Sequence, residues 1–599
     1  MWVGGSSDTF SERRFRGRVR GLSFAFALGC ALIVLRLFDL QVLRGADLAM
    51  LSESNRTQVI FLRAPRGDFF DRKGRAIVRN RPTWSLMYSV GEKHRKEGPA
   101  VQAALMPFLS SFPVMWERRL ARAHQTGQMV RLVENVPDEV AFLMREMEHL
   151  FPGLRVVMEF RRGYPYGSYA AHLIGYLGEV SERELKDDDN SHLKPGDLVG
   201  KMGLERVQDE FLRGEDGGML IEVDSVGRLK RVIKELPFQK GGSIHLTLDL
   251  DLQKIAEEGL AETPTQRGAA VLMDVNTGAI LVWASAPSFD PLGTLAEDLK
   301  DPRFPFLDRV YRGTYPPGSV FKPVTAIAAF ERDAINTARA VNCTGVVILK
   351  DKGGTERRYR CWKIHGWVDY WRAMAESCDT YFYLLGQQIG SQAVSEVATQ
   401  FGFGRTVQDT LPGELKGAVP NPIWKRRAGL GGWSTGDTFN MSIGQGFLTA
   451  TPLQVVSFYQ TLATRGRTVV PYLIETLTDG NGQVVEKAQP RVSREVTLKE
   501  ATWDRLLKSL EGVVQSGTAG GTRIDFLDVR GKTGTAENPH GEAHAWFAGF
   551  AGYKGEAPRY AVAVFVENGG HGGVVSVPIA RKLLEAALPI SAAPVGTLK

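Results

Sequence analysis

The sequence predicts a multidomain α/β (α+β) chain with a single N-terminal transmembrane helix. Three observations lead to this prediction. The chain has 599 residues, which is too long for one hydrophobic core. An apolar run follows an arginine-rich N-terminus. A Gly-Gly break near residue 240 separates an irregular α+β region from a region where strand and helix patterns alternate.

The composition is that of a folded protein with an ordinary surface. Apolar residues make up 43% of the chain and charged residues 24%, with a formal net charge of +7. The sequence contains no long Lys/Arg block and no basic residues interleaved with aromatic ones. Nucleic acid is therefore not expected as a partner.

The N-terminal segment predicts a membrane anchor. Residues 1–20 form a predicted cytoplasmic tail that carries five arginines in SERRFRGRVR, and residues 21–43 are mainly apolar. A spanning helix needs about 20 such residues. A cleaved signal peptide is the alternative, but no small-residue cleavage site follows the run. Arginines before the span place that end in the cytoplasm, so the remainder is expected outside.

The rest of the chain divides into three predicted parts. Residues 44–239 are turn-rich, with a tight turn at 71–74, and contain short helices and hairpins. Residues 240–588 form one large α/β domain, which includes a hairpin whose turn is Asn276-Thr277-Gly278. Residues 589–599 are a predicted flexible tail. No period of 20–50 residues recurs, which excludes a repeat protein.

A Ser-x-x-Lys pair, Ser319 and Lys322, is the first chemical signal. Pro317-Gly318 supplies a sharp turn before it, and an apolar helical pattern follows it. Alone, such a pair is weak, since Ser191 and Lys194 form the same pattern in a polar loop. Residues three apart share a helix face. The context therefore predicts that the Lys322 amine reaches the Ser319 hydroxyl at a helix N-terminus.

Two further motifs follow in order along the chain. Ser377 and Asp379 stand in ESCDTYFY, and Lys532-Thr533-Gly534-Thr535 stands in GKTGTAE. Ser-x-x-Lys, then Ser-x-[Asn/Asp], then Lys-Thr-Gly is the signature of penicillin-recognising serine acyltransferases. Each motif alone is compatible with chance, whereas their order and local context together are not.

The residue types fit acyl transfer. A serine hydroxyl is a poor nucleophile until a base removes its proton. Lys322 is able to act as that base only as the neutral amine, and both burial and a nearby cation such as Lys532 lower the pKa of a lysine. Ser377 is expected to relay the proton to the leaving amine.

The third motif predicts a substrate-binding strand. Lys532 with Thr533 and Thr535 is expected to hold a substrate carboxylate, and Gly534 lets a substrate backbone lie along the strand. The backbone N–H groups of Ser319 and Thr535 form the predicted oxyanion hole, a feature that typically lowers a barrier by a few kcal/mol.

These motifs identify a family resemblance that covers nearly the whole chain. TYPPGSVFKP, ESCDTYFY, TFNMSIGQGFLTATPLQ and GKTGTAE resemble the transpeptidase part of class B, monofunctional penicillin-binding proteins. LRLFDLQVLRG, LSESNRT, PRGDFFDRKG, YPYGSYAAHLIGYLGE and GKMGLERVQDEFLRGEDG resemble their N-terminal part, and the last two favour the penicillin-binding protein 2 branch, which serves elongation. The resemblance implies an elongated α+β pedestal of the dimerisation type, and a C-terminal domain of the penicillin-binding and β-lactamase type whose central antiparallel sheet is flanked by helices.

The resemblance also implies peptidoglycan D,D-transpeptidation without a required cofactor. Ser319 would attack the penultimate D-Ala of a stem pentapeptide, terminal D-Ala would leave, and an amine of a neighbouring stem would take the acyl group. β-Lactams would acylate the same serine. Because no glycosyltransferase domain fits in the chain, the expected partners at the inner membrane are a SEDS-family glycosyltransferase and elongation scaffold proteins. A division-type transpeptidase, a β-lactam sensor and a D,D-carboxypeptidase are the alternatives.

Two questions stay open on the sequence. Asp379 stands where the wider family usually has Asn, and an ionised Asp379 would pair with Lys322 and oppose its use as a base. Cys343, Cys361, His365 and Cys378 predict either a structural zinc site or a Cys343–Cys361 disulfide with Cys378 as a buried thiol. The fourth cysteine, Cys30, lies in the predicted span.

Overall fold

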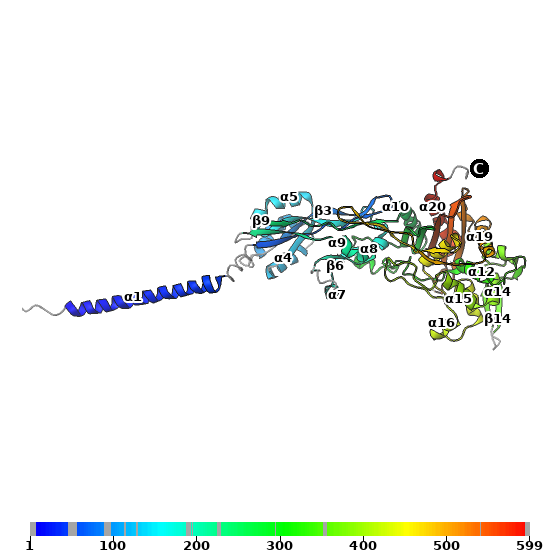
Figure 1. Cartoon of the computed structure of the whole chain (residues 1–599), viewed down its shortest axis with the longest axis horizontal. Coiled ribbons are helices and arrows are strands. Elements are labelled where there is room, and N and C mark those ends of the chain that lie inside the picture. The colour runs from blue at the N-terminus through cyan, green and yellow to red at the C-terminus, as the bar shows by residue number, and fades with distance from the viewer. Residues whose placement is uncertain are drawn as a thin grey trace, which may run out of the picture. The chain divides into compact units, whose positions relative to one another are not determined.

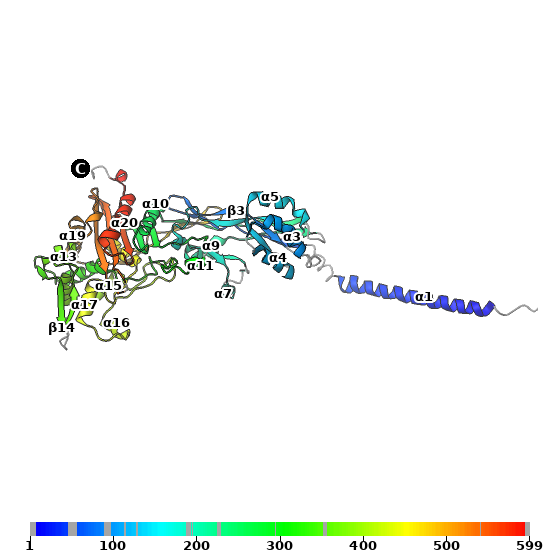
Figure 2. The same cartoon turned by 180° about the vertical axis from the view of Figure 1, so that it is seen from behind.

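The computed structural model of the protein shows two compact units (Figures 1 and 2). It describes residues 8–45, 57–88, 98–112, 115–126, 130–151, 153–186, 193, 196–223, 229–293, 295–350, 356–539 and 541–593. Unit 1 comprises Met1–Pro65, Arg81–Arg161 and Glu215–Gln239, and unit 2 comprises Arg66–Asn80, Arg162–Gly214 and Lys240–Lys599. The units thus differ from the predicted domains 44–239 and 240–588, since two segments before residue 240 belong to unit 2.

The N-terminal segment is a long helix. α1 (Asp8–Phe38) continues into a short π-helix, η1 (Asp39–Leu43). Phe15–Leu43 is long and apolar enough to cross a membrane, and in the part of the chain that the structure describes it is the one such helix. Its apolar side chains are exposed in the isolated chain, as expected for a segment whose solvent is lipid.

Besides α1 and η1, the described residues of unit 1 form two groups of strands, three α-helices and a short 3-10 helix, η3 (Glu148–Leu150). β1 (Thr57–Leu62), β8 (Gly217–Val223) and β9 (Leu229–Leu236) form an antiparallel three-stranded sheet. The end of β3 (Ala76–Tyr88) pairs with β4 (Val130–Val136), and β5 (Leu154–Gly163) pairs with β3. α3 (Gly98–Leu109), α4 (Met115–Thr126) and α5 (Asp138–Glu146) contribute Leu105, Leu109, Leu120 and Met144 to the core beneath them.

The N-terminal segments of unit 2 surround a buried ionic cluster. Glu205 on α8 (Gly203–Val207) has no exposed surface. Its carboxylate accepts hydrogen bonds from Arg66 Nη2 at 2.9 Å and from Arg162 Nε at 2.6 Å. The predicted turn at 71–74 follows β2 (Phe69–Phe70) and closes with a 2.9 Å hydrogen bond from the Gly74 N–H to the Asp71 carbonyl.

Short elements complete this part of unit 2. They are α6 (Ala171–Ile174), β6 (Leu177–Glu179), α7 (Glu182–Leu185), β7 (Leu198–Gly200), α9 (Asp209–Arg213), β10 (Ser243–Leu246), β18 (Ile474–Thr478) and β19 (Val484–Lys487). β10 pairs with β2 in parallel and with β18 antiparallel.

A five-stranded antiparallel sheet forms the centre of unit 2. Its strand order is β12 (Ile280–Ala286), β11 (Gly268–Asp274), β23 (Tyr560–Val566), β22 (His544–Tyr553), β21 (Leu527–Ala536). Every residue of β22 and β23 is buried. Because successive side chains of a strand point to opposite faces, both faces of the sheet are covered. α10 (Leu250–Ala261), α18 (Pro452–Ala463) and α20 (Gly572–Ala587) pack on it, which confirms the predicted antiparallel sheet flanked by helices.

The remaining helices and hairpins of unit 2 carry the polar motifs. The helices are η5 (Gly318–Phe321), α12 (Lys322–Phe330), α13 (Tyr370–Ala375), α14 (Asp379–Ile389), α15 (Ser391–Gln400), α16 (Pro422–Arg427), α17 (Thr435–Ser442) and α19 (Glu500–Gln515). Two small antiparallel pairs join β13 (Val341–Cys343) to β16 (Gly366–Val368) and β14 (Val346–Lys350) to β15 (Glu356–Arg360). The predicted flexible tail starts with an ordered turn, η7 (Ile590–Ala592), while 594–599 lie outside the described residues.

The ionic cluster yields a test of the fold. Replacing Glu205 by Ala leaves two guanidinium groups buried without their shared carboxylate, which typically costs about 3 kcal/mol or more. We expect Glu205→Ala to lower the free energy of unfolding by that amount in denaturant titrations of the full chain in detergent. Glu556→Ala, an exposed change in the same unit, is the control and is expected to change it by less than about 0.5 kcal/mol. Equal stability of the two variants would contradict this assignment.

Candidate active site

Ser319 lies in the first turn of η5, directly after a glycine that the turn requires. Gly318 has φ +56°, a left-handed conformation that glycine adopts without steric cost. Its N–H donates a 2.8 Å hydrogen bond to the Gly444 carbonyl. Ser319 is 8% exposed, and within the described parts of the chain its hydroxyl makes no hydrogen bond. Ser319 thus lies at a helix start, as predicted from Pro-Pro-Gly.

The Lys322 amine points to the second motif. Lys322 begins α12 and has no exposed surface. Its Nζ donates hydrogen bonds to the Ser377 carbonyl at 2.8 Å, to Ser377 Oγ at 3.0 Å and to Asp379 Oδ1 at 2.8 Å. The predicted hydrogen bond to Ser319 is not formed in this structure, because three acceptors that include a carboxylate hold the amine more strongly than one hydroxyl does.

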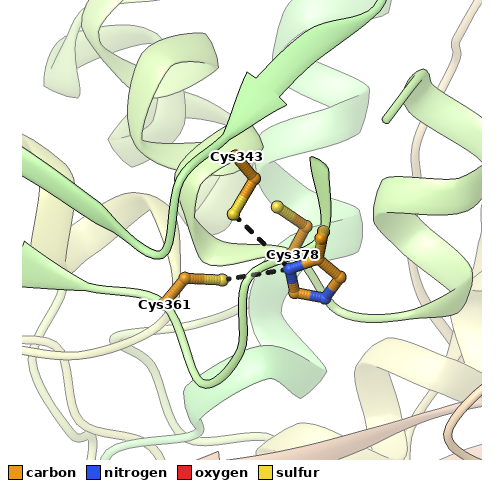
Figure 3. A group of neighbouring side chains, drawn as sticks. Cys343, Cys361 and Cys378 are labelled. Atoms are coloured by element: carbon orange, nitrogen blue, oxygen red, sulfur yellow. Dashed lines mark hydrogen bonds between the residues drawn. The ribbon is translucent and has the colours of Figure 1, made fainter. Parts of the chain in front are cut away.

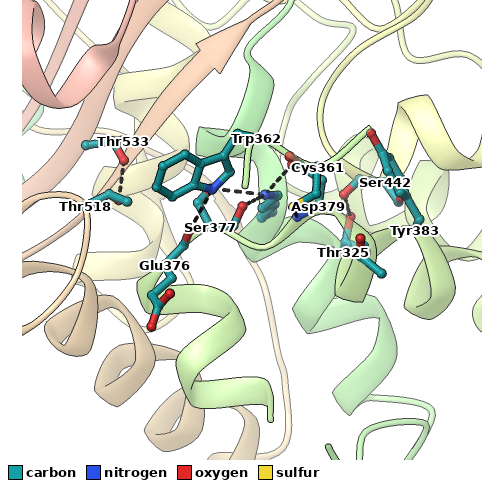
Figure 4. Close-up of polar contacts among 12 residues, drawn as sticks. Thr325, Cys361, Trp362, Glu376, Ser377, Asp379, Tyr383, Ser442, Thr518 and Thr533 are labelled. Carbon is teal, nitrogen blue, oxygen red and sulfur yellow. Dashed lines mark hydrogen bonds and ion pairs between the residues drawn. The ribbon is translucent and has the colours of Figure 1, made fainter. Parts of the chain in front are cut away.

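Ser377 is held in an unusual backbone conformation. Its φ is +58°, which few residues other than glycine adopt. The neighbouring backbone fixes it on both sides: the Cys378 N–H donates to the Ala373 carbonyl at 2.8 Å, and Trp362 Nε1 donates to the Glu376 carbonyl at 3.0 Å. Figure 4 shows Trp362 beside Glu376 and Ser377. Sequence reasoning did not identify Trp362, which no catalytic motif contains.

Asp379 begins α14 and pairs with Lys322. Burial raises the pKa of the Asp379 carboxyl above its ordinary value, and the Lys322 charge opposes this shift. Its backbone N–H donates to Cys361 Sγ at 3.2 Å. Burial therefore favours the form of Asp379 in which the carboxyl is protonated.

Lys532 brings a second buried amine to the site from β21. Its Nζ donates to the Thr533 carbonyl at 3.1 Å. Burial, and then the charge of Lys322, lower the pKa of Lys532 well below its ordinary value, while Asp379 opposes the shift. Repulsion from the charge of Lys322 thus contributes to the lowered pKa of Lys532.

Gly534 allows β21 to approach the turn that carries Ser319. A Cβ at this position would lie 2.9 Å from Trp546 Cβ and 3.0 Å from the Pro317 carbonyl oxygen. A larger residue would push the strand away from the turn that carries Ser319. The structure thus gives Gly534 a packing role in addition to the predicted room for substrate.

Two threonine hydroxyls lie beside this strand. Thr533 Oγ1 and Thr518 Oγ1 are 2.5 Å apart (Figure 4). Thr518 precedes β21 in the segment SGTAGG, and sequence reasoning missed it because Ser-Gly-Thr is common in turns. β21, which also carries Thr535, ends the five-strand order, so among the described strands only β22 pairs with it. Its outer edge therefore offers backbone groups to an extended ligand.

The Cys/His cluster forms behind the second motif. Cys343, Cys361, His365 and Cys378 are buried, and their potential ligand atoms lie within 4.8 Å of one another (Figure 3). All three cysteines are free thiols, so the Cys343–Cys361 disulfide is not formed in this structure.

Two sulfur–nitrogen distances in the cluster match those of a tetrahedral metal site. Zinc–ligand bonds of 2.3 Å to sulfur and 2.0–2.1 Å to nitrogen place the two atoms about 3.6 Å apart, and the Cys343 and Cys361 sulfurs each lie 3.5 Å from His365 Nδ1. A hydrogen bond from the Cys378 thiol and two backbone N–H groups lower the pKa of Cys361 to about 3. The same hydrogen bond raises the pKa of Cys378. Thiolate is the form that binds zinc, so Cys361 is already in that form, and the residue types of the cluster fit this metal.

Comparison with known proteins agrees with this arrangement. Residues 268–585, more than half of the chain, match the family described as penicillin binding protein transpeptidase domain, and 61–246 match the penicillin-binding protein dimerisation domain. The peptidoglycan D,D-transpeptidase MrdA of Acinetobacter baumannii is 32% identical over 94% of this chain and 87% of its own, and that of Escherichia coli K12 is 30% identical over 92% and 91%.

Solved structures of related proteins share the fold. Penicillin-binding protein 2 of Helicobacter pylori, in its complex with MreC, is 26% identical and covers 88% of this chain and 99% of its own, with a TM-score of 0.74. A chain of a peptidoglycan synthase complex that coordinates polymerization and crosslinking is 30% identical over 97% and 100%, with a TM-score of 0.70. The chain therefore belongs to the class B penicillin-binding proteins, in the branch of penicillin-binding protein 2.

Proposed function

We propose that the chain is the peptidoglycan D,D-transpeptidase of cell elongation and that Ser319 is its nucleophile. The observation that carries the proposal is the convergence of three motifs, distant in sequence, on one buried centre. Lys322 Nζ lies 3.0 Å from Ser377 Oγ and 2.8 Å from Asp379 Oδ1, and β21 packs against the turn of Ser319 through Gly534.

Acylation requires a neutral amine at Lys322. Transfer of its proton to Asp379 gives a neutral amine beside a carboxylic acid, and burial of Asp379 favours this step. The free amine then takes the Ser319 hydroxyl proton while Oγ attacks the carbonyl carbon of the penultimate D-Ala. The backbone N–H groups of Ser319 and Thr535 hold the developing oxyanion.

The proton then returns to the leaving group. Ser377 Oγ, within hydrogen-bond distance of Lys322, passes it to the nitrogen of the terminal D-Ala, the C–N bond breaks, and D-Ala leaves. In the second half-reaction an amine of a neighbouring stem attacks the Ser319 ester and loses its proton by the same route. Attack by water in place of the amine accounts for a residual D,D-carboxypeptidase activity.

The substrate carboxylate is held at β21. Lys532 with Thr533 and Thr535 binds it, and Thr518, which shares a hydrogen bond with Thr533, adds a further hydroxyl. An extended stem peptide pairs with the outer edge of the strand. β-Lactams carry a carboxylate and a reactive amide in the corresponding positions, so they acylate Ser319.

A structural zinc ion completes the second motif. Cys343, Cys361, His365 and Cys378 supply its ligands, and Cys361 Sγ also accepts the Asp379 N–H at 3.2 Å. These residues would hold the ion next to the start of α14, on which Asp379 stands, and the ion would supply rigidity there.

The chain is placed in the inner membrane by its N-terminal helix. The arginines before this helix stay in the cytoplasm, and both the pedestal, 44–239, and the transpeptidase part, 240–588, lie in the periplasm. Nascent peptidoglycan comes from a SEDS-family glycosyltransferase that the transmembrane helix and pedestal contact. The Helicobacter pylori relative is seen in complex with MreC, which supports a scaffold partner of this kind.

Labelling with a fluorescent penicillin tests the nucleophile. We expect Ser319→Ala to lose labelling by at least about 1,000-fold, because no other group forms the ester. Ser191→Ala, the same change at the other Ser-x-x-Lys pair, is the matched control and is expected to label as the unaltered protein does. Labelling that survives in Ser319→Ala and disappears in Ser191→Ala would assign the nucleophile to Ser191.

The fall of the acylation rate constant on the alkaline side of the pH profile tests the role of Lys532. Because the pKa of Lys532 is lowered, its charge is lost as the pH rises at values well below those of an ordinary lysine. We expect the second-order rate constant for acylation by benzylpenicillin to fall over that range. In Lys532→Arg the charge persists at high pH, so this limb should flatten. An unchanged limb in the arginine variant would show that another group causes it.

Metal content tests the Cys/His cluster. We expect about one zinc per chain in elemental analysis of protein purified without chelator, and a loss of most of it in Cys378→Ser. Cys30→Ser, which removes the cysteine of the predicted span, is the control and should retain the metal. Zinc-free protein with a mapped Cys343–Cys361 disulfide would remove the proposal.

A further inference from the structure

The β14–β15 hairpin presents one face to solvent and the other to the domain. The register pairs Ile348 with Arg358 and Val346 with Arg360, and directly opposed residues share a face. Arg358 and Arg360 are exposed, and Ile348 is 44% exposed. In both Figures 1 and 2, β14 projects from the body of its unit.

The opposite face of the hairpin anchors it. Val347, Leu349 and Tyr359 are partly buried and pack on the domain core. The Tyr359 ring lies edge-on to Phe439 on α17, with ring centroids 5.1 Å apart. The outward face is therefore fixed in place and does not depend on a partner for its own order.

The outward face is basic near its base, where Arg358 and Arg360 stand, while at its far end Glu356 pairs with Lys350 at 3.1 Å. Within the described ranges, neither Arg358 nor Arg360 forms an ion pair or a side-chain hydrogen bond. Next to it stand two exposed apolar side chains of the loop that follows β15: Trp362 is 53% exposed and Ile364 is 74% exposed. Ile364 packs against Gly345 at the base of β14. We call Ile348, Arg358, Arg360, Trp362 and Ile364 the hairpin surface.

The base of the hairpin surface is tied to the second catalytic motif. Tyr383 Oη on α14 donates to the Arg360 carbonyl at 3.1 Å, the Asp379 N–H donates to Cys361 Sγ at 3.2 Å, and Trp362 Nε1 donates to the Glu376 carbonyl at 3.0 Å. Arg360, Cys361 and Trp362 are consecutive, so the surface ends at the residues on either side of Ser377.

We propose that the hairpin surface binds the acceptor, an uncross-linked peptidoglycan strand whose stem peptides carry free carboxylates. This rests on the proposed transpeptidase function. The donor carboxylate is held at Lys532 on β21, whereas the acceptor amine must give its proton to the Ser377 relay and must therefore arrive from the Ser377 side. The hairpin lies on that side.

The chemistry of the surface fits such a strand. Arginine binds carboxylates through paired N–H groups. The half-exposed Trp362 ring, with Lys363 Nζ 4.8 Å from its centroid, offers apolar surface to a sugar ring. Five residues per strand, at about 3.3 Å each, give a surface roughly 16 Å long, enough for several sugars. An acidic face of a partner protein would bind the same arginines. A surface for such a protein would have no reason to end beside the proposed proton relay, Ser377.

Strand binding is measured with full-length protein in detergent. The probe is soluble uncross-linked peptidoglycan, polymerised from lipid-linked precursor in the presence of penicillin, and free stem pentapeptide is used in parallel. We expect the double variant Arg358→Glu, Arg360→Glu to bind the strand at least tenfold more weakly and to lose cross-linking yield, while penicillin still labels Ser319 at the unaltered rate. Equal loss for the pentapeptide assigns the contact to stem carboxylates, and loss for the strand alone assigns it to the glycan.

Two further variants keep the result interpretable. Arg358→Gln, Arg360→Gln removes the charges without reversing them and should give a smaller loss. Arg581→Glu, Lys582→Glu places the same charge change on exposed residues of α20 and should bind as the unaltered protein. Unchanged strand binding and cross-linking in the Arg358→Glu, Arg360→Glu protein would overturn the proposal. The proposal would also be overturned if this variant bound the strand normally but no longer bound an acidic partner protein. If penicillin did not label Ser319 in the unaltered protein, the proposed function would be wrong. Strand binding is measured in a separate assay, so the two failures are distinguishable.

Discussion

The site depends on one buried interaction, the hydrogen bonds that the Lys322 amine donates to Ser377 and Asp379. A lysine with no exposed surface is costly unless its charge is paired and its protons are hydrogen-bonded. Here two oxygens of Ser377 and one of Asp379 meet those needs within 3.0 Å. The same contacts set the direction of the amine and its distance of 3.0 Å to the Ser377 hydroxyl. In the proposed acyl transfer, Lys322 passes a proton to Asp379 before it takes one from Ser319.

Much of the surrounding structure serves to keep that pair in place. Ser377 holds a left-handed backbone conformation only because the Cys378 and Trp362 hydrogen bonds fix the peptides on either side. Cys361 adds a bond to the Asp379 N–H, which links the Cys/His cluster to the start of α14. The hairpin surface includes residues of the same loop, which follows β15. The Cys/His cluster, the left-handed Ser377 and the basic hairpin are thus connected through consecutive residues, and each restricts the position of the next.

The sequence predicted the chemistry better than it predicted the geometry. The three motifs, the turn before Ser319 and the antiparallel sheet follow from residue types, spacing and the family resemblance. The direction of the Lys322 amine does not, since an i, i+3 spacing allows contact with Ser319 and cannot reveal acceptors 55 residues further along the chain. Cysteine spacing likewise could not decide between a zinc site and a disulfide, because each requires the side chains to be close in space and sequence spacing does not give that distance. Thr518, Trp362 and the two N-terminal segments of unit 2 were missed because only tertiary contacts identify them.

The central claim is that the Lys322 pair activates Ser319 to form an acyl-enzyme. The most direct measurement is mass spectrometry of the peptide that contains Ser319, taken during turnover of a stem pentapeptide and paired with a count of the D-Ala released. The account predicts an acyl adduct on Ser319, one D-Ala released for each adduct formed, and loss of both in Lys322→Ala. An adduct on another residue, or release of D-Ala from Lys322→Ala at the unaltered rate, would contradict it.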